Sequence, residues 1–197
     1  MSDLNELRRV LEAYTPTTPG QAAERARFLD FVAVHPDCCE RRLAVGHITG
    51  SALVLSSDGQ RTLLTHHRKL GLWLQPGGHA DGDTDLARVA LREAEEETGL
   101  HGLRVEPAVF DLDRHWIPER KGETGHWHYD LRFLVHAGAD ETFQVSAESH
   151  ALAWRPLSTV ASDPAMDASL RRMARQWLAR AEFGGSNSAV PDSGNGQ

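Results

Sequence analysis

The chain has 197 residues, a formal net charge of -7, and compositions of 40% hydrophobic and 25% charged residues. These values are typical of a globular protein with room for one domain and a hydrophobic core. The acidic balance argues against binding along a nucleic acid duplex, which needs a basic surface, and no apolar run is long enough to span a bilayer.

The N-terminal residues "MSDLNELRRV" lack the apolar core of a signal peptide. We therefore expect a cytoplasmic protein that has no membrane partner. The two cysteines, Cys38 and Cys39, are adjacent and cannot close a useful loop, so we interpret them as partly buried structural thiols.

Two helices are expected at the start of the chain. Apolar residues recur at helical spacing over 4–14 and 19–34, and "TPTTPG" between them ends one helix and starts the next. These elements predict an N-terminal helical extension over residues 1–45. From residue 46 onward the sequence pattern becomes typical of β-strands.

The second part of the chain alternates strand and helix patterns. The sequence "GHITGSALVLSS", a "DG" turn and "RTLLTHH" predict a β-hairpin, followed by a strand in "LGLWLQ" and the breaker "PGG". The remaining predicted elements are a helix over 85–97, strands near 103–112, 126–136 and 151–156, and an amphipathic helix over 164–182. The composition of residues 184–197 predicts a disordered tail.

Carboxylates are concentrated in the last turns of the predicted helix, in "LREAEEETGL". A helix C-terminus carries partial negative charge, so acidic side chains there are unfavourable unless something compensates them. Glu93, Glu96 and Glu97 fall on one side of a helical wheel, whereas Glu95 points elsewhere. A rigid array of carboxylate oxygens suits Mg²⁺ or Mn²⁺, although charge runs can also form a merely solvated face.

The segment from Gly78 to Leu100, "GHADGDTDLARVALREAEEETGL", resembles the Nudix box, G-x5-E-x7-R-E-U-x-E-E-x-G-U, where U is apolar. The positions that match in register are Gly78, Arg92, Glu93, Ala94, Glu96, Glu97, Gly99 and Leu100. Thr84 stands where the family has its first Glu, which ordinarily braces the loop by pairing with the Arg. Asp83 or Asp85 could pair with Arg92 instead.

The resemblance implies an α/β fold, the Nudix-type α/β/α sandwich with a mixed sheet, over residues 46–183. It also implies a pyrophosphohydrolase that acts on a diphosphate linkage in a nucleoside diphosphate linked to another moiety. The implied cofactor is Mg²⁺ or Mn²⁺, which neutralises diphosphate oxygens and lowers the pKa of the attacking water. The substrate would be a small molecule, and its identity stays open.

Carried over by position, the resemblance also assigns residues of this chain to the site. The metal ligands would be the Gly78 carbonyl and the carboxylates of Glu93, Glu96 and Glu97. Arg92 would orient a glutamate. Glu93, Glu97 or a Glu outside the box would act as the general base, and the choice among them stays open.

A second group of polar residues lies on the predicted strand "HWHYDLRFLV". Strict alternation places Trp127, Tyr129, Leu131, Phe133 and Val135 on a core face and the intervening residues on a face toward solvent or a cleft. His66, His67 and His79 lie near the strand ends that lead into the acidic helix. The predicted substrate-binding residues are therefore His66, His67, His79, His126, His128, Asp130 and Arg132.

Two alternatives stay open beside the hydrolase. Thr84 is the sequence feature that favours a Nudix-like nucleotide-binding sensor with little or no turnover. His126, His128 and Asp130 could instead form the centre of a zinc hydrolase, because histidine nitrogens suit Zn²⁺. The N-terminal helices could shape the pocket or a homodimer interface, and the oligomeric state is open.

Overall fold

The computed structural model describes residues 4–68, 70–120, 122, 124–145 and 149–185. The elements in chain order are α1 (Leu4–Ala13), α2 (Pro19–Val34), β1 (Gly46–Leu55), β2 (Arg61–His67), β3 (Trp73–Leu74), β4 (Gly77–His79), α3 (Leu86–Thr98), β5 (Arg104–Val105), β6 (Asp111–Ile117), β7 (His126–His136), β8 (Ser149–Pro156), α4 (Leu157–Ser162) and α5 (Ala168–Gly185). The predicted tail lies outside the described residues, apart from the last two residues of α5.

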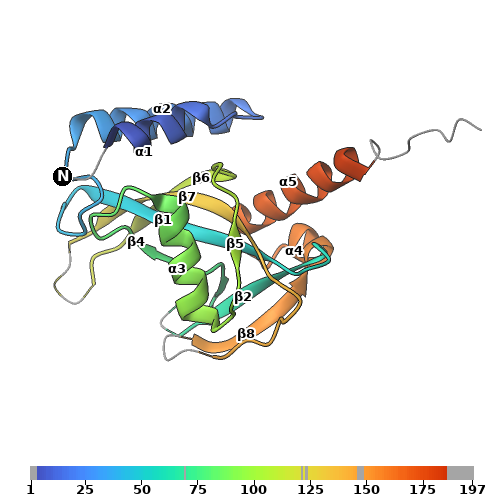
Figure 1. Ribbon diagram of the computed structural model, residues 1–197. Coiled ribbons are helices and arrows are strands. Elements are labelled where there is room, and N and C mark those ends of the chain that lie inside the picture. The colour runs from blue at the N-terminus through green and yellow to red at the C-terminus, as the bar shows by residue number, and fades with distance from the viewer. Residues whose placement is uncertain (1–3, 69, 121, 123, 146–148, 186–197) are drawn as a thin grey trace, which may run out of the picture.

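A mixed sheet forms the centre of the molecule (Figure 1), with the order β3-β2-β1-β7-β5. β1 and β7 pair in parallel over ten positions, from Gly46 opposite Trp127 to Leu55 opposite His136. The other pairings are antiparallel: β2 and β4 pair with β1, β6 and β5 with β7, and β8 and β3 with β2. The predicted α/β fold with a mixed sheet is confirmed.

Two hydrophobic cores lie on the two faces of this sheet, because alternate residues of β1 and β7 point to opposite sides. On one face, Ile48 and Leu131 belong to a core that includes buried residues of α1, α2 and α3. On the other face, Leu53 and Leu134 belong to a second core with α4 and α5. The helices therefore cover the sheet from both sides, as expected for the α/β/α sandwich.

The N-terminal helices are part of the first core. Thr18 caps α2 by accepting a hydrogen bond from the Gln21 amide, as expected for a threonine before a Pro-initiated helix. Further along α2, the Phe31 ring stacks on Tyr129 of β7 with a centroid separation of 3.9 Å. Phe28 meets the same tyrosine edge-on at 5.3 Å. The extension is thus packed against the strand that carries the polar alternation.

The segment between α2 and β1 holds the start of the sheet through its backbone. The Cys38 carbonyl accepts a hydrogen bond from the Ile48 amide at 2.8 Å, and the Cys39 carbonyl accepts one from the Gly82 amide at 2.9 Å. Both thiols are free and buried, in agreement with the predicted burial, and their structural role stays a prediction. The 35–45 segment therefore contacts both β1 and the loop before α3.

Several local features of the structure differ from the predictions. The strand expected over 70–75 is limited to β3, and the strand expected over 103–112 is split into β5 and β6. The short helix α4 was not predicted, and α5 starts later than expected because Asp167 accepts hydrogen bonds from the Ser169 and Leu170 amides and caps it. No helix in the described part of the chain is long and apolar enough to cross a membrane.

We predict that Phe31→Ala lowers the free energy of unfolding by about 3–5 kcal/mol, because it removes a buried ring from the core shared by α2 and β7. Urea unfolding measured by circular dichroism tests this. Val34→Ala, on the same helix but 69% exposed, is the matched control and should change stability by less than about 0.5 kcal/mol. An unchanged urea midpoint of unfolding in Phe31→Ala would mean that the N-terminal extension does not contribute to the stability of the core.

Candidate active site

The helix α3 is held with its acidic side turned away from the core. Asp85 caps its first turn by accepting a hydrogen bond from the Arg88 amide at 3.1 Å. Gly99 ends it in the left-handed conformation, with φ of 66°. Val89, Ala90 and Ala94 are buried against the sheet, so the glutamates of the last turns lie on the remaining surface.

The strand exit at Gly77 and Gly78 meets two of these glutamates. A Glu97 carboxylate oxygen accepts a hydrogen bond from the Gly77 amide at 2.8 Å. The Glu93 carboxylate lies against Gly78 so closely that a Cβ there would be 2.4 Å from its Oε2 atom. Only glycine allows this approach. Glu96 is exposed on the same helix.

Arg92 forms its hydrogen bonds with its neighbour on α3, Glu93, and with the His79 carbonyl, not with the carboxylates of the preceding loop. Its guanidinium donates to the Glu93 carboxylate at 2.9 Å and to the His79 carbonyl at 3.2 Å. The hydrogen bond to Glu93 raises the pKa of Arg92 above its usual value. Arg92 therefore fixes Glu93 beside the residues that end β4.

The expectation that Asp83 or Asp85 pairs with Arg92 is wrong. Asp83 accepts a hydrogen bond from Arg88 at 2.8 Å, and Asp85 is the helix cap. Thr84 is half-buried between them. The loop is thus braced by a different arginine on the first turn of α3, which explains how it keeps its shape without the family's first Glu.

Asp130 and Arg132 are buried inside an ion network, so the expectation that they face solvent or a cleft is wrong, while their assignment to substrate binding stays a prediction. Each is 3% exposed. The Thr49 and Ser51 hydroxyls donate to Asp130 at 3.0 and 2.7 Å, and Arg132 donates to it at 2.7 Å. The alternation itself is correct, but α5 covers this end of the strand face.

The same network joins β6 to α5. The Arg132 guanidinium also lies 3.2 Å from Asp113 and 3.6 Å from Asp111. Arg172 of α5 donates to Asp111 through two nitrogens, at 3.0 and 2.6 Å. These contacts lower the pKa of Asp113 well below its usual value despite its burial, because two guanidinium groups and His115 stabilise the carboxylate. The network favours a structural function for Arg132.

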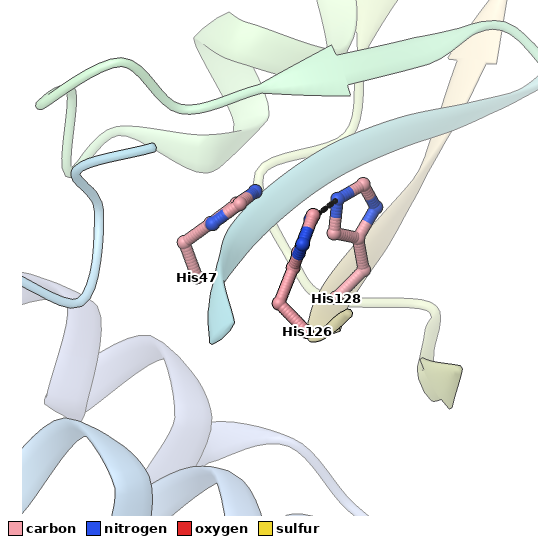
Figure 2. Close-up of side chains that lie close together, drawn as sticks. All are labelled: His47, His126 and His128. Atoms are coloured by element: carbon pink, nitrogen blue, oxygen red, sulfur yellow. Dashed lines mark hydrogen bonds between the residues drawn. The ribbon is translucent and has the colours of Figure 1, made fainter. Parts of the chain in front are cut away.

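Histidine rings gather where β1 and β7 begin, on the sheet face opposite α3. His47, which is not among the residues predicted from the sequence, lies beside His128 in the parallel register. Its ring centroid is 4.8 Å from those of His126 and His128 and 5.0 Å from that of His79. Figure 2 shows the His47, His126 and His128 side chains, and one ligand nitrogen from each lies within 4.8 Å of the others.

Burial keeps two of these rings neutral. Burial and, to a smaller extent, the neighbouring histidines lower the pKa of His47 to about 4 and that of His128 to about 2. The Leu43 carbonyl opposes this effect at His47 but does not outweigh it. Neutral imidazoles have a free nitrogen lone pair, which is the form that binds metal ions.

His66 and His67 make different contacts. The His66 ring stacks on Trp73 at 5.1 Å and faces His150 at 5.7 Å, and the His67 ring accepts a hydrogen bond from the Leu70 amide at 3.2 Å. They therefore lie with β3 and β8. The structure brings together His79, His126 and His128 but does not add His66 to that group.

A cleft of about 860 Å³ opens between the α1–α2 connection, residues 107–110 and α5. It is mostly apolar, with Arg172, Arg175 and Arg180 on one wall. Its described lining includes none of the predicted site residues. Because the carboxylates and the histidines carry the chemistry, we place the candidate site at β4 and α3 rather than in this cleft.

These features, an acidic helix that follows a glycine strand exit in an α/β/α sandwich, define a Nudix-type hydrolase fold. The model of the NUDIX domain family matches residues 47–177. The chain belongs to this family.

Relatives and solved structures are similar over parts of the chain. It is 31% identical over 96 residues to the RNA pyrophosphohydrolase of Sphingopyxis alaskensis, covering 42% of this chain and 58% of that protein. It is 39% identical over 64 residues to the m7GpppN-mRNA hydrolase NUDT17 of Danio rerio, covering 30% of this chain and 21% of that protein. The chain therefore spans less than two thirds of either relative.

Two solved structures share the fold at 20% sequence identity. They are a Caenorhabditis elegans Ap4A hydrolase binary complex, with a TM-score of 0.56 over 69% of this chain and 98% of that one, and the MutT protein of Methanosarcina mazei Go1, with a TM-score of 0.57 over 71% and 98%. At this identity the likeness establishes the fold alone.

We predict that Arg132→Met lowers the free energy of unfolding by about 3–5 kcal/mol, because it leaves the buried Asp130 carboxylate without its cation and removes one of the two cations near Asp111 and Asp113. Urea unfolding measures the effect. Arg104→Met, on exposed strand β5, is the control and should change stability little. If Arg132→Met instead kept full stability and only weakened substrate binding, the structural assignment of Arg132 would be wrong.

Proposed function

We propose that the protein is a divalent-metal-dependent hydrolase of a diphosphate linkage in a nucleoside diphosphate linked to another moiety. The observation that carries this proposal is the contact between the strand exit and the acidic helix. Glu93 lies against Gly78, and Glu97 accepts the Gly77 amide hydrogen. Two carboxylates are thereby fixed beside a backbone carbonyl.

The residues present fit a hard cation. Glu93, Glu96, Glu97 and the Gly78 carbonyl would hold Mg²⁺ or Mn²⁺, since all offer oxygen atoms and the absence of a Cβ at Gly78 lets the Glu93 carboxylate lie against it. When bound, such a cation neutralises diphosphate oxygens and lowers the pKa of a water nucleophile. It would also remove the mutual repulsion of carboxylates at the end of α3.

The chain's own side chains would position the reacting groups. Arg92 orients Glu93 through its hydrogen bond, and the Gly77 amide orients Glu97. Glu93, Glu97 or a Glu outside the box would take the proton from water. His79, which follows Gly78 directly, and His126 and His128 stay predicted substrate-binding residues.

The names of two relatives support a nucleotide substrate. One is named an RNA pyrophosphohydrolase and the other an m7GpppN-mRNA hydrolase. The net charge of -7 makes a long polyanion an unfavourable ligand for this chain. We therefore propose a small nucleotide as substrate, with a short 5′-triphosphorylated or capped RNA as a second class to test, and we place the activity in the cytoplasm.

The sensor alternative loses much of its support. It depended on a loop weakened by Thr84, whereas Asp83 with Arg88 and the Asp85 cap stabilise that loop. The acidic side chains needed for turnover are also present.

We predict that Glu97→Gln lowers kcat by about 10²–10⁴-fold while the protein stays folded, because the substitution keeps the size of the side chain and removes its charge. Nucleotide or phosphate release from nucleoside diphosphate sugars, dinucleoside polyphosphates and short capped RNA, with Mg²⁺ or Mn²⁺, is the measurement. Glu95→Gln is the matched control on the same helix and should retain near wild-type turnover.

Two results would contradict this proposal. Equal turnover in Glu97→Gln and Glu95→Gln would remove the acidic helix from the reaction. Binding of nucleotide by the wild type without any turnover on the whole panel would favour the sensor.

We also predict that Gly78→Ala raises the Mg²⁺ concentration for half-maximal activity by about 10-fold or more, because the added Cβ displaces the Glu93 carboxylate. Titration of activity against Mg²⁺ tests this. Gly138→Ala is the control, since a Cβ there meets its nearest neighbour at an ordinary 3.9 Å. An unchanged Mg²⁺ requirement would mean that Glu93 and Gly78 do not share a cation.

A further inference from the structure

The His47 ring is buried and makes no hydrogen bond of good geometry. The residue is 2% exposed, and neither ring nitrogen has a well-aligned hydrogen-bond partner among the described residues, although the Leu43 carbonyl is near enough to oppose the fall of the His47 pKa. Buried polar atoms are nearly always paired, because an unpaired one loses its hydration and gains nothing in return. An imidazole with both nitrogens unpaired therefore requires an explanation.

The neighbouring histidines offer nitrogen lone pairs at the same place. The Nδ1 atom of His126 lies 2.8 Å from the Thr124 carbonyl and must donate to it, since a carbonyl only accepts. In the neutral ring this leaves the His126 Nε2 atom as an acceptor. That atom lies 3.3 Å from the His128 Nε2 atom.

This separation agrees with shared coordination of one ion. Tetrahedral zinc with Zn–N bonds of about 2.0–2.1 Å places neighbouring ligand nitrogens about 3.3–3.4 Å apart. A hydrogen bond between the two rings could produce a similar distance, but it would leave His47 unexplained. Because one ligand nitrogen of His47 lies within 4.8 Å of those of His126 and His128, a modest ring rotation completes the group.

We propose that His47, His126 and His128 form a Zn²⁺ site with three protein ligands. Three imidazole nitrogen ligands favour zinc or a similar transition metal over Mg²⁺, which prefers oxygen ligands. The contact from His126 to the Thr124 carbonyl is the kind of outer contact that fixes the tautomer of a metal-binding histidine. The fourth position is left for water or for an oxygen of a bound ligand.

This site is separate from the acidic helix. Successive residues of β4 point to opposite faces of the sheet: Gly78 meets Glu93, whereas the His79 ring lies 5.2 Å from that of His128. Two groups of ligands with different metal preferences would therefore lie on the two sides of one short strand. The zinc proposal does not depend on the reaction proposed above.

Zinc binding to the full chain tests the proposal. Protein stripped of metal with a chelator is titrated with zinc chloride in excess Mg²⁺ by calorimetry, and bound zinc is then counted by elemental analysis. We expect one Zn²⁺ per chain. We expect His47→Leu and His126→Gln each to weaken zinc affinity by at least about 100-fold, since loss of a ligand should exceed the 10–100-fold effect of outer contacts.

Thermal stability gives a second readout, because the difference in Tm between His47→Leu and the wild type should change sign between zinc-free and zinc-loaded protein. Without zinc, His47→Leu should melt at the wild-type Tm or above it, because it removes two unpaired buried nitrogens. At zinc concentrations of about 100 times Kd, the Tm of the wild type should rise by about 5–10 °C and that of His47→Leu should not. His126→Gln, at a less buried position, gives the same test should His47→Leu fold poorly.

Two controls separate this site from the acidic helix and from surface binding. His101→Gln changes an exposed histidine outside the group and should bind zinc as the wild type does. The double variant Glu93→Gln/Glu97→Gln should lose turnover and keep its zinc. The proposal is overturned if the wild type binds no zinc, if His47→Leu and His126→Gln bind it with unchanged affinity, or if only the glutamate variant loses it.

Discussion

The parallel pairing of β1 with β7 is the constraint on which both the fold and the candidate sites depend. It joins residues about eighty positions apart in the sequence and fixes which side chains share a face. His47 lies beside His128, and Thr49 and Ser51 come close enough to donate to Asp130. A slip by one residue would move each of these side chains into the opposite core, so the two apolar cores and the polar groups specify the same register.

The sequence was sufficient for features that depend on local patterns. The N-terminal extension was identified from helical periodicity, the hairpin from the DG turn, and the box from the spacing of Gly78, Arg92 and the glutamates. Each of these patterns is contained in a short stretch of sequence. The sequence could not identify His47, since its importance arises only from a strand that comes much later. The alternation of β1, with His47, Thr49 and Ser51 on one face, was the signal present, but nothing local marked that face as polar and buried.

The same limit explains the assignment of Asp130 and Arg132. Alternation correctly separated them from the core residues of β7, but it could not show that α5 would supply Arg172 to the same cluster. Whether a strand face is exposed to solvent, lines a cleft or is buried in the core can be decided only when the helix that covers it is known. The bracing of the loop before α3 is a related case, because Arg88 and Arg92 were equally available partners until the helix fixed their directions.

The backbone contacts of the 35–45 segment bear on where the working unit of this protein begins. The family model starts at residue 47, yet Cys38 and Cys39 hold the first strand and the loop at Gly82 through their carbonyls. The Glu40 carboxylate also lies 3.0 Å from where a Cβ on Gly82 would be. A chimera joined at the family boundary would thus lose the support of the loop that leads into the acidic helix, so a functional graft has to carry the preceding segment with it.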